Sequence, residues 1–351
     1  MKFEAVTIKD IAKALSLSTS TVSRALRDSY EISPETKQMV LDCAEKLNYQ
    51  PNPIAKSLRD RRSGSVGVVV CEIANSFFSQ VINGIESIAY DKGYNVIISQ
   101  SHESYEREVI NLKYLSSRSV DGLLVSLSTE TNDLSHLQYL HSKGLPMVFF
   151  DRVANSIPTH QVTVDNFKGA YEATEHLIKS GYRRIATLTN SAYLSITTER
   201  VAGYKAALES NGQKVQDSHI KFCFYGGMIF SEIEVALDSL MMLKQRPDAI
   251  FATSDKLTTG CLKYFRKKGM KVPDDIALVG FSNSEIAEML NPSLTVVRQP
   301  AMEMGKCAME LLLNLIESKR KITQFDKKVL DPELFIRESS RPASIGSGFP
   351  V

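Results

Sequence analysis

Residues 18–24 read STSTVSR, a run of four hydroxyl side chains that ends in a cation. Helix interiors usually avoid such a run, because Ser and Thr hydroxyls compete with the backbone for hydrogen bonds. On an exposed helix, short hydroxyls allow close approach and bond phosphates, and an arginine can bind the two acceptors of a guanine. The run therefore indicates a surface that contacts duplex DNA, unless it only caps a solvated amphipathic helix.

Two short helices are predicted to position this run. The Thr7 and Asp10 pair has capping-box spacing, so a helix begins at residue 8, and Ser18 can cap a second helix after a three-residue turn. Two helices joined in this way form a helix-turn-helix. The apolar faces are Ile8, Ile11, Ala12 and Leu15 on the first helix and Val22, Ala25 and Leu26 on the second.

A third helix is predicted after Ser33 as its cap and Pro34 at its first position. It provides hydrophobic cover for the first two helices, and this arrangement favours the DNA-reading interpretation over a solvated helix. Its apolar stripe is Met39, Val40, Cys43, Ala44 and Leu47. The side chains left outward on the second helix are Thr19, Ser20, Ser23 and Arg24.

Composition limits the class of protein. A chain of 351 residues is expected to form two or three domains, and its 43% hydrophobic and 23% charged residues are typical of a globular protein. Residues 1–62 hold eleven Lys and Arg against eight Asp and Glu, so a basic head precedes a near-neutral body. The five cysteines include no CxxC pair, so we expect free thiols. The sequence shows no signal-like apolar region and no apolar run long enough to span a membrane, so we expect a cytoplasmic protein with no membrane partner.

The body alternates apolar strand-like runs with helical stretches, which predicts parallel sheets covered on both faces. The strand-like runs are too many for one small sheet, so two doubly wound α/β lobes are expected. These runs are VGVVVC, YNVIIS, GLLVS, MVFF, RIATLT, IKFCF, AIFAT and IALVGF.

Polar side chains follow several of these strands, where ligands bind in doubly wound sheets. Polar groups with phenylalanines nearby predict a site for a polyhydroxylated ligand. An Asp151–Arg152 ion pair or a structural salt bridge of Arg200 are the alternatives. The strand-end residues are Asn75, Phe77, Phe78, Asp151, Arg152, Ser191, Arg200, Ser254, Asp255, Ser282 and Asn283.

Enzyme interpretations find no support in the sequence. It contains no GxGxxG after a strand, no Walker loop, no GxSxG and no HExxH, and its six histidines show no ligand spacing. We therefore expect no catalysis, no cofactor and no metal site.

The segments TIKDIAKALSLSTSTVSRAL and ISPETKQMVLDCAEKLNYQPNPIAKSLR resemble the headpiece of the lactose/galactose repressor family of bacterial transcription regulators. The resemblance continues to about residue 340. It implies a helix-turn-helix headpiece, a periplasmic-binding-protein-like core of two lobes, and a homodimer that binds a pseudo-palindromic operator. It also implies control by a small-molecule effector, a sugar or sugar derivative, with repression favoured over activation. A transport-type solute receptor with the same core is the alternative, and the headpiece and the missing export signal argue against it.

The resemblance assigns roles residue by residue. Base contacts fall on Thr19, Ser20 and Arg24, with Leu58 as a minor-groove wedge on a hinge helix at 52–59. Backbone contacts fall on Thr7, Ser18, Thr21, Ser23, Ser33, Thr36, Tyr49 and Asn52. Asp151, Arg200, Ser254 and Ser282 become the strongest effector candidates, joined by Met228 and Gln299. The sequence departs from the family at Ser16, where Gly is usual, at Ser254, where Asn is usual, and at Ser282, where Asp is common.

The expected domains are a headpiece at 1–51, a hinge helix and linker at 52–62, and a core at 63–340. Within the core, lobe 1 is expected to contain 63–162 and 291–325, and lobe 2 to contain 163–290 and 326–340. The chain would thus cross between lobes near 162, 291 and 325.

Overall fold

The computed structural model describes residues 6–50, 62–320 and 322–341. The chain divides into two compact units, 1–63 and 64–351. Within the described residues, no helix has the length and apolar character needed to cross a membrane.

The first unit contains three helices, α1 (Ile8–Leu15), α2 (Thr19–Ala25) and α3 (Pro34–Lys46). The predicted caps are present. The Thr7 backbone N–H donates to the Asp10 carboxylate at 2.8 Å, and the Ser18 hydroxyl oxygen accepts from the Thr21 N–H at 3.0 Å. The Ser33 hydroxyl oxygen accepts from the Thr36 N–H at 3.3 Å. The helix-turn-helix and the third helix are therefore confirmed.

The core of this unit is smaller than the sequence pattern predicted. Ile11, Val22 and Val40 are fully buried, but Met39 is 49% exposed and Leu47 is 36% exposed. The expectation that both line the core is wrong, because two short helices cover only a narrow stripe of α3. Ser16 adopts a left-handed conformation with φ 53°, the geometry for which the family usually supplies glycine.

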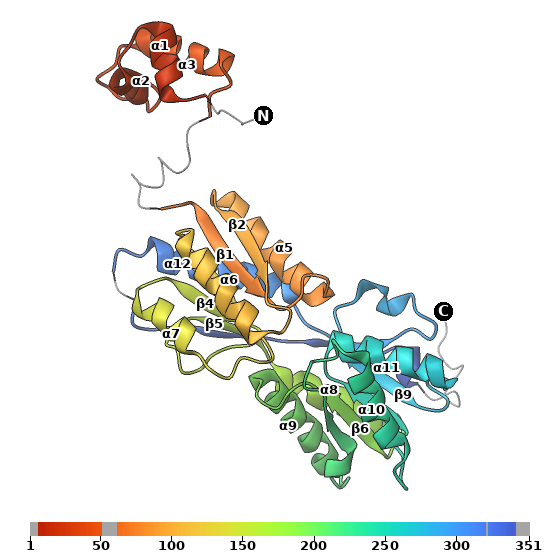
Figure 1. The fold of residues 1–351 in the computed structure, drawn as a ribbon. Helices are drawn as coiled ribbons and strands as arrows, with labels where there is room; N and C mark the ends of the chain where they lie inside the picture. The colour runs from red at the N-terminus through yellow and green to blue at the C-terminus, as the bar shows by residue number, and fades with distance from the viewer. Residues whose placement is uncertain (1–5, 51–61, 321, 342–351) are drawn as a thin grey trace. The chain divides into compact units, whose positions relative to one another are not determined.

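The second unit consists of two lobes, each with a six-stranded sheet (Figure 1). All neighbouring strands in the first sheet are parallel, in the order β11-β5-β4-β3-β1-β2. Its strands are β1 (Ser65–Val70), β2 (Asn95–Gln100), β3 (Gly122–Val125), β4 (Met147–Phe150), β5 (Gln161–Val164) and β11 (Lys327–Leu330).

The second sheet has the order β12-β10-β9-β8-β6-β7, and only β12 runs antiparallel to its neighbour. All eight strands expected from the sequence are present, and the fold class is confirmed. The sheet's strands are β6 (Ile185–Thr189), β7 (Ile220–Phe222), β8 (Ala249–Ala252), β9 (Ala277–Phe281), β10 (Thr295–Arg298) and β12 (Glu333–Phe335).

The expected lobe boundaries need correction. β10 belongs to the second sheet, so residues 295–298 are not in lobe 1, and β11 belongs to the first sheet, so residues 327–330 are not in lobe 2. The chain crosses between sheets after β5, after β10 and between β11 and β12. The boundaries were misplaced because the eight apolar runs do not include β10 or β11. Each of these short strands joins its sheet before the chain crosses to the other lobe.

Helices cover both faces of each sheet, as continuous apolar strands require. In Figure 1, α5 and α12 lie on the first lobe and α8, α10 and α11 on the second. The first sheet is covered by α5 (Ser76–Asp91), α6 (Tyr105–Ser117), α7 (Ser135–Ser142) and α12 (Ala301–Glu317). The second is covered by α8 (Asn166–Lys179), α9 (Ser195–Ser210), α10 (Phe230–Met241) and α11 (Asp255–Lys268).

The α5–α12 contact predicts a sensitive position. A Cβ added at Gly84 would overlap the backbone carbonyl of Met302, and backbone atoms of a packed helix cannot rotate away. Gly84→Ala is therefore expected to destabilise the core by about 1–3 kcal/mol, although alanine normally favours a helix. Chemical denaturation of the full chain measures this change. The exposed neighbour Asn83→Ala is the control, and equal stability of both variants would contradict the packing argument.

Candidate functional site

The candidate DNA-reading surface lies on the first unit. Thr19, Ser20 and Arg24 are exposed on α2, as predicted, and the Ser18 hydroxyl bonds the hydroxyls of Ser20 and Thr21 at 2.8 Å each. Arg24 also pairs with Glu31, with NH1 and Oε2 2.8 Å apart. Helix α2 thus presents hydroxyls and a guanidinium that match the groups needed for a major groove.

The predicted backbone contacts lie around this surface. Thr7, Ser18 and Ser33 are exposed, and Thr21, Ser23, Thr36 and Tyr49 are half-buried. The Ser23 hydroxyl accepts from Arg27 at 2.9 Å, so a phosphate would compete with that contact. Asn52, Leu58 and the proposed hinge helix at 52–59 lie outside the described residues.

The candidate effector site is a cavity between the two lobes, at the carboxyl ends of their strands. Eleven of the residues named from the sequence line it: Asn75, Phe77, Phe78, Asp151, Arg152, Arg200, Ser254, Asp255, Ser282, Asn283 and Gln299. The other lining residues are Asn190, Ile196 and Phe281. The strand-end rule therefore located the cavity.

Two predicted residues do not line the cavity. Ser191 is buried with its hydroxyl unpartnered among the described residues, and Met228 is 39% exposed on a loop. The sequence analysis also missed Asn190 and Phe281, although Asn190 directly follows one strand-like run, Phe281 ends another, and the same rule applies to them. Ile196 carried no such signal, because it lies on the face of α9.

Arg200 is the central cation of the cavity and is only 3% exposed. Its Nε donates to Asn166 Oδ1 at 2.8 Å, NH1 donates to the Thr253 carbonyl at 2.5 Å, and NH2 donates to Gln299 Oε1 at 3.1 Å. The guanidinium carbon lies 3.8 Å from the centre of the Phe281 ring. Burial lowers the pKa of Arg200 to about 10, and the charge of nearby Asp151 offsets only part of this shift.

Asp151 is the facing carboxylate, and it adopts a left-handed backbone conformation with φ 59°. Burial raises its pKa. The neighbouring Arg152 is 3.8 Å away but binds Glu103 in a bidentate pair, with contacts of 2.6 and 3.0 Å. Arg152 is thus mainly engaged by Glu103, and the alternative of a simple Asp151–Arg152 pair does not describe this site.

The departures at Ser254 and Ser282 have structural explanations. The Ser254 hydroxyl oxygen caps α11 by accepting from the Leu257 N–H at 3.4 Å. The Ser282 hydroxyl donates to the Asp255 carboxylate, whose pKa is raised by burial. A carboxylate is therefore present beside Ser282 even though residue 282 itself has none.

A hydrogen-bond network joins the lobes at the edge of this cavity. Asn283 Nδ2 donates to Gln80 Oε1 at 2.9 Å, and Gln80 Nε2 donates to the Asn283 carbonyl at 3.3 Å. Asn283 also exchanges two hydrogen bonds with the Gln299 backbone, at 2.7 and 3.0 Å. Because Gln299 holds Arg200, the network connects α5 of the first lobe to the cation of the cavity.

The cavity is small, with a volume of about 40 Å³. That space holds a few water molecules, whereas pockets for drug-sized ligands measure about 300–1,000 Å³. A sugar-sized ligand therefore requires the lobes to move apart.

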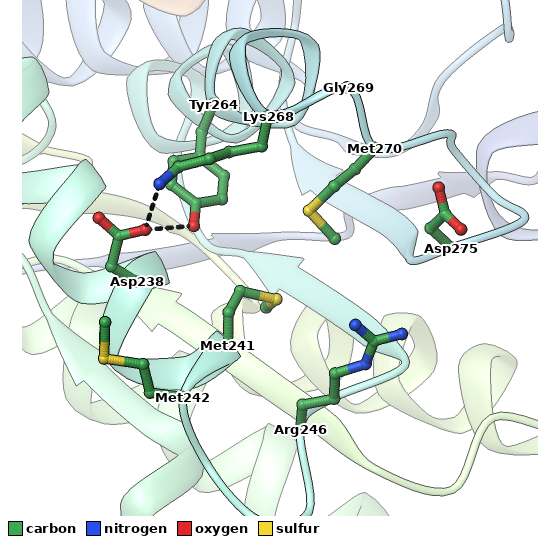
Figure 2. A pocket seen from close by; sticks show the side chains of 9 residues that line it. All are labelled: Asp238, Met241, Met242, Arg246, Tyr264, Lys268, Gly269, Met270 and Asp275. Carbon is green, nitrogen blue, oxygen red and sulfur yellow. Dashed lines mark hydrogen bonds and ion pairs between the residues drawn. The ribbon is translucent and has the colours of Figure 1, made fainter.

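A larger hollow of about 450 Å³ lies at the C-terminal ends of α10 and α11 (Figure 2). Its acidic Asp238 is already bound by Lys268 at 2.8 Å and by the Tyr264 hydroxyl at 2.7 Å. It lies in the second lobe alone, away from the interlobe cavity, so its size does not make it the better effector site.

Comparison with known proteins agrees with this arrangement. Residues 7–52 match the model of bacterial regulatory proteins, lacI family, and residues 174–340 match the periplasmic binding protein-like domain. The HTH-type transcriptional repressor PurR of Vibrio campbellii is 32% identical over 335 residues, covering 95% of this chain and 98% of that protein.

Solved structures give the same result. The cellobiose complex of the transcriptional regulator CelR has a TM-score of 0.69 and 29% identity, covering 95% of this chain and 99% of that one. A lac repressor dimer bound to operator and an anti-inducer shares the fold, with a TM-score of 0.79 and 23% identity over 96% of this chain and 100% of that one. With its helix-turn-helix head, its two-lobed core and these relatives, this chain belongs to the lacI family of bacterial regulatory proteins, DNA-binding transcriptional regulators controlled by a small-molecule effector.

Proposed function

We propose that the chain is a homodimeric repressor that binds a pseudo-palindromic operator through α2. A sugar or sugar derivative, acting as the effector, changes its affinity for the operator. The observation that carries the proposal is the cavity around Arg200, which contains buried polar groups from both lobes. An effector bound there contacts both lobes and so favours one lobe arrangement over another. Binding chromosomal DNA is consistent with the cytoplasmic location expected from the sequence.

The sugar assignment rests on the groups of the cavity. Asp151, Asp255 and Arg200 supply charged acceptors and donors, and Phe77, Phe78 and Phe281 supply apolar ring faces. This combination suits hydroxyl-rich rings, and CelR, with the same fold, binds cellobiose. The absence of enzyme motifs in the sequence agrees with relatives that are regulators.

The proposed base and backbone contacts remain those of the sequence analysis. Thr19, Ser20 and Arg24 would read bases, and Thr7, Ser18, Thr21, Ser23, Ser33, Thr36 and Tyr49 would bind the phosphates. Asn52 and Leu58 complete the set, on the basis of the resemblance alone. The expected domain division, with the corrected crossings, is part of the same proposal.

Exposed apolar side chains support the homodimer. Ile98 on the edge strand β2 is 39% exposed, and Ile110 and Tyr114 on α6 are 65% and 50% exposed. On the second lobe, Phe222 at the edge strand β7, Tyr225 and Val235 are 50%, 45% and 70% exposed. Such patches mark protein interfaces, so we propose that these surfaces of both lobes form the dimer interface.

The experiment that tests the proposal combines two steps. The full chain selects its operator from random duplexes, and a thermal-shift screen then tests mono- and disaccharides, sugar phosphates and nucleosides, because a specific ligand raises apparent stability. The proposal requires salt-dependent, sequence-selective binding that a hit from the screen alters. Protein that binds a sugar but no duplex would instead fit the solute-receptor alternative.

The Gln80–Asn283 contact yields a prediction about effector affinity. If the lobes must part, effector binding breaks this pair, and Gln80→Leu removes hydrogen bonds worth roughly 1–2 kcal/mol in total, so the effector should bind about 5- to 30-fold more tightly. Calorimetric titration with a sugar found by the screen measures the change. Ser79→Ala on the same helix is the control, and unchanged or weaker binding by Gln80→Leu would show that the bound state keeps the contact.

A further inference from the structure

The base-reading candidate Arg24 is held by an acidic residue from the loop between α2 and α3. Arg24 NH1 lies 2.8 Å from Glu31 Oε2, and the two side chains are 53% and 45% exposed. Glu31 was not among the residues expected to affect DNA binding. A carboxylate on the surface that faces a polyanion is repelled by phosphates, so its position beside Arg24 needs a reason.

The geometry leaves Arg24 able to read a base while Glu31 holds it. Among the described residues, Glu31 is the ion-pair partner of Arg24, through NH1, and neither Nε nor NH2 of Arg24 makes a hydrogen bond. A guanidinium has five N–H donors, so the edge formed by Nε and NH2 remains open. That edge can donate to the O6 and N7 of a guanine, which is the usual bidentate contact.

The loop that carries Glu31 is itself fixed. Ile32 packs against the core of the first unit, and its backbone N–H donates to the Ser29 carbonyl at 3.2 Å. Asp28 is bound by Lys37 of α3, with Oδ1 and Nζ 2.6 Å apart. The backbone of the loop on both sides of Glu31 is therefore held in place by these contacts.

An exposed ion pair adds little to stability, so stability does not explain this contact. It does restrict a long side chain before DNA arrives, which lowers the entropy lost when Arg24 binds a base. The same carboxylate repels the backbone of any duplex. The restriction of Arg24 raises the ratio of specific to non-specific affinity, whereas the repulsion lowers both affinities together.

We propose that Glu31 is a specificity-determining residue that positions Arg24 toward guanine and weakens binding to non-cognate DNA. This inference rests on the proposed DNA-reading function. The other role for such a contact is competition, in which Glu31 sequesters Arg24 and must release it before any base is read. The two roles predict opposite changes in specificity when the contact is removed.

Two variants separate contact from charge. Glu31→Asp keeps the charge but shortens the side chain, so it should weaken binding to the selected operator about 5- to 10-fold and leave binding to a shuffled duplex unchanged. Glu31→Gln removes the charge, so it should strengthen binding to the shuffled duplex. Glu45→Gln is the matched control, because Glu45 is an exposed acid of α3 without a hydrogen bond or ion pair of its side chain in the described chain. It should shift both affinities equally.

The measurement is fluorescence anisotropy of the full-length protein on both duplexes at two salt concentrations, with circular dichroism to verify folding. Glu31→Asp should have no effect on specificity in the Arg24→Ala background, since the proposed role acts through Arg24. Unchanged or increased specificity in Glu31→Asp, or an equal loss without Arg24, would overturn the proposal. A wild-type protein that prefers no duplex would overturn the DNA-reading function itself, and this inference with it.

Discussion

Arg200→Met is expected to abolish the effector response of operator binding and to leave effector-free operator affinity nearly unchanged. Hydrogen bonds from a charged group contribute about 1.5–3 kcal/mol, so effector affinity should fall about 10- to 150-fold. The effector would lose the one cation of the cavity that is not engaged by a carboxylate within ion-pair distance among the described residues. Thermal shift and operator titration with a sugar found by screening measure both quantities.

Methionine is chosen because it retains volume and packs against Phe281. The substitution leaves the oxygens of Asn166, Thr253 and Gln299 without a donor, which costs stability, but it also removes a buried charge, which gains some. Lys205→Met, a half-buried position on the same helix, is the control. A wild-type response in Arg200→Met at wild-type effector concentrations would mean that the effector binds elsewhere.

Arg24→Ala is expected to cost about 1–3 kcal/mol of operator affinity per half-site and to relax the preference for one base pair. The residue is exposed on α2, and its Nε–NH2 edge is available to a base. Selection of binding sites by the variant, compared with the wild type, identifies the relaxed position.

Arg27→Ala provides the comparison, because Arg27 is a neighbouring cation that binds back to Ser23 through contacts of 2.8 and 2.9 Å. It should reduce affinity for all duplexes alike and leave the base preference intact, as a loss of positive charge does. Should both variants keep the same base preference as the wild type, Arg24 is not part of the readout.

Both predictions concern the control of operator binding by an effector. An effector that weakens operator binding must itself bind less tightly when the operator is present, by the same factor. In the described core, hydrogen bonds from Gln80 through Asn283 and Gln299 to Arg200 join the contact between the lobes to the cavity.

Much of the site could be read from the sequence. The caps at Thr7, Ser18 and Ser33 depend on residues three positions apart, and hydrogen bonds of such short range follow from local sequence. The buried strands are continuous apolar runs, and in parallel sheets their carboxyl ends collect polar residues at one edge. Arg200 and Asp151 were therefore identifiable before any tertiary contact was known.

Other features arise only from long-range contacts. β10 and β11 are short strands that become strands because neighbours distant in sequence supply their hydrogen bonds. Met228 and Ser191 were expected in the cavity, but Met228 lies on the surface and Ser191 is buried outside the cavity lining. Their positions depend on the path of the backbone after each strand, which no local sequence pattern determines.

The sequence by itself determined the helix-turn-helix, the two-lobed class and most of the cavity's residues, because these follow from periodicity and short-range caps. Only the tertiary structure decided that Arg152 is engaged by Glu103, that Asp255 reaches Ser282, and that Glu31 holds Arg24. The physical reason is that a charged side chain takes whichever partner the packed backbone brings within a few ångströms, and that choice depends on the whole fold.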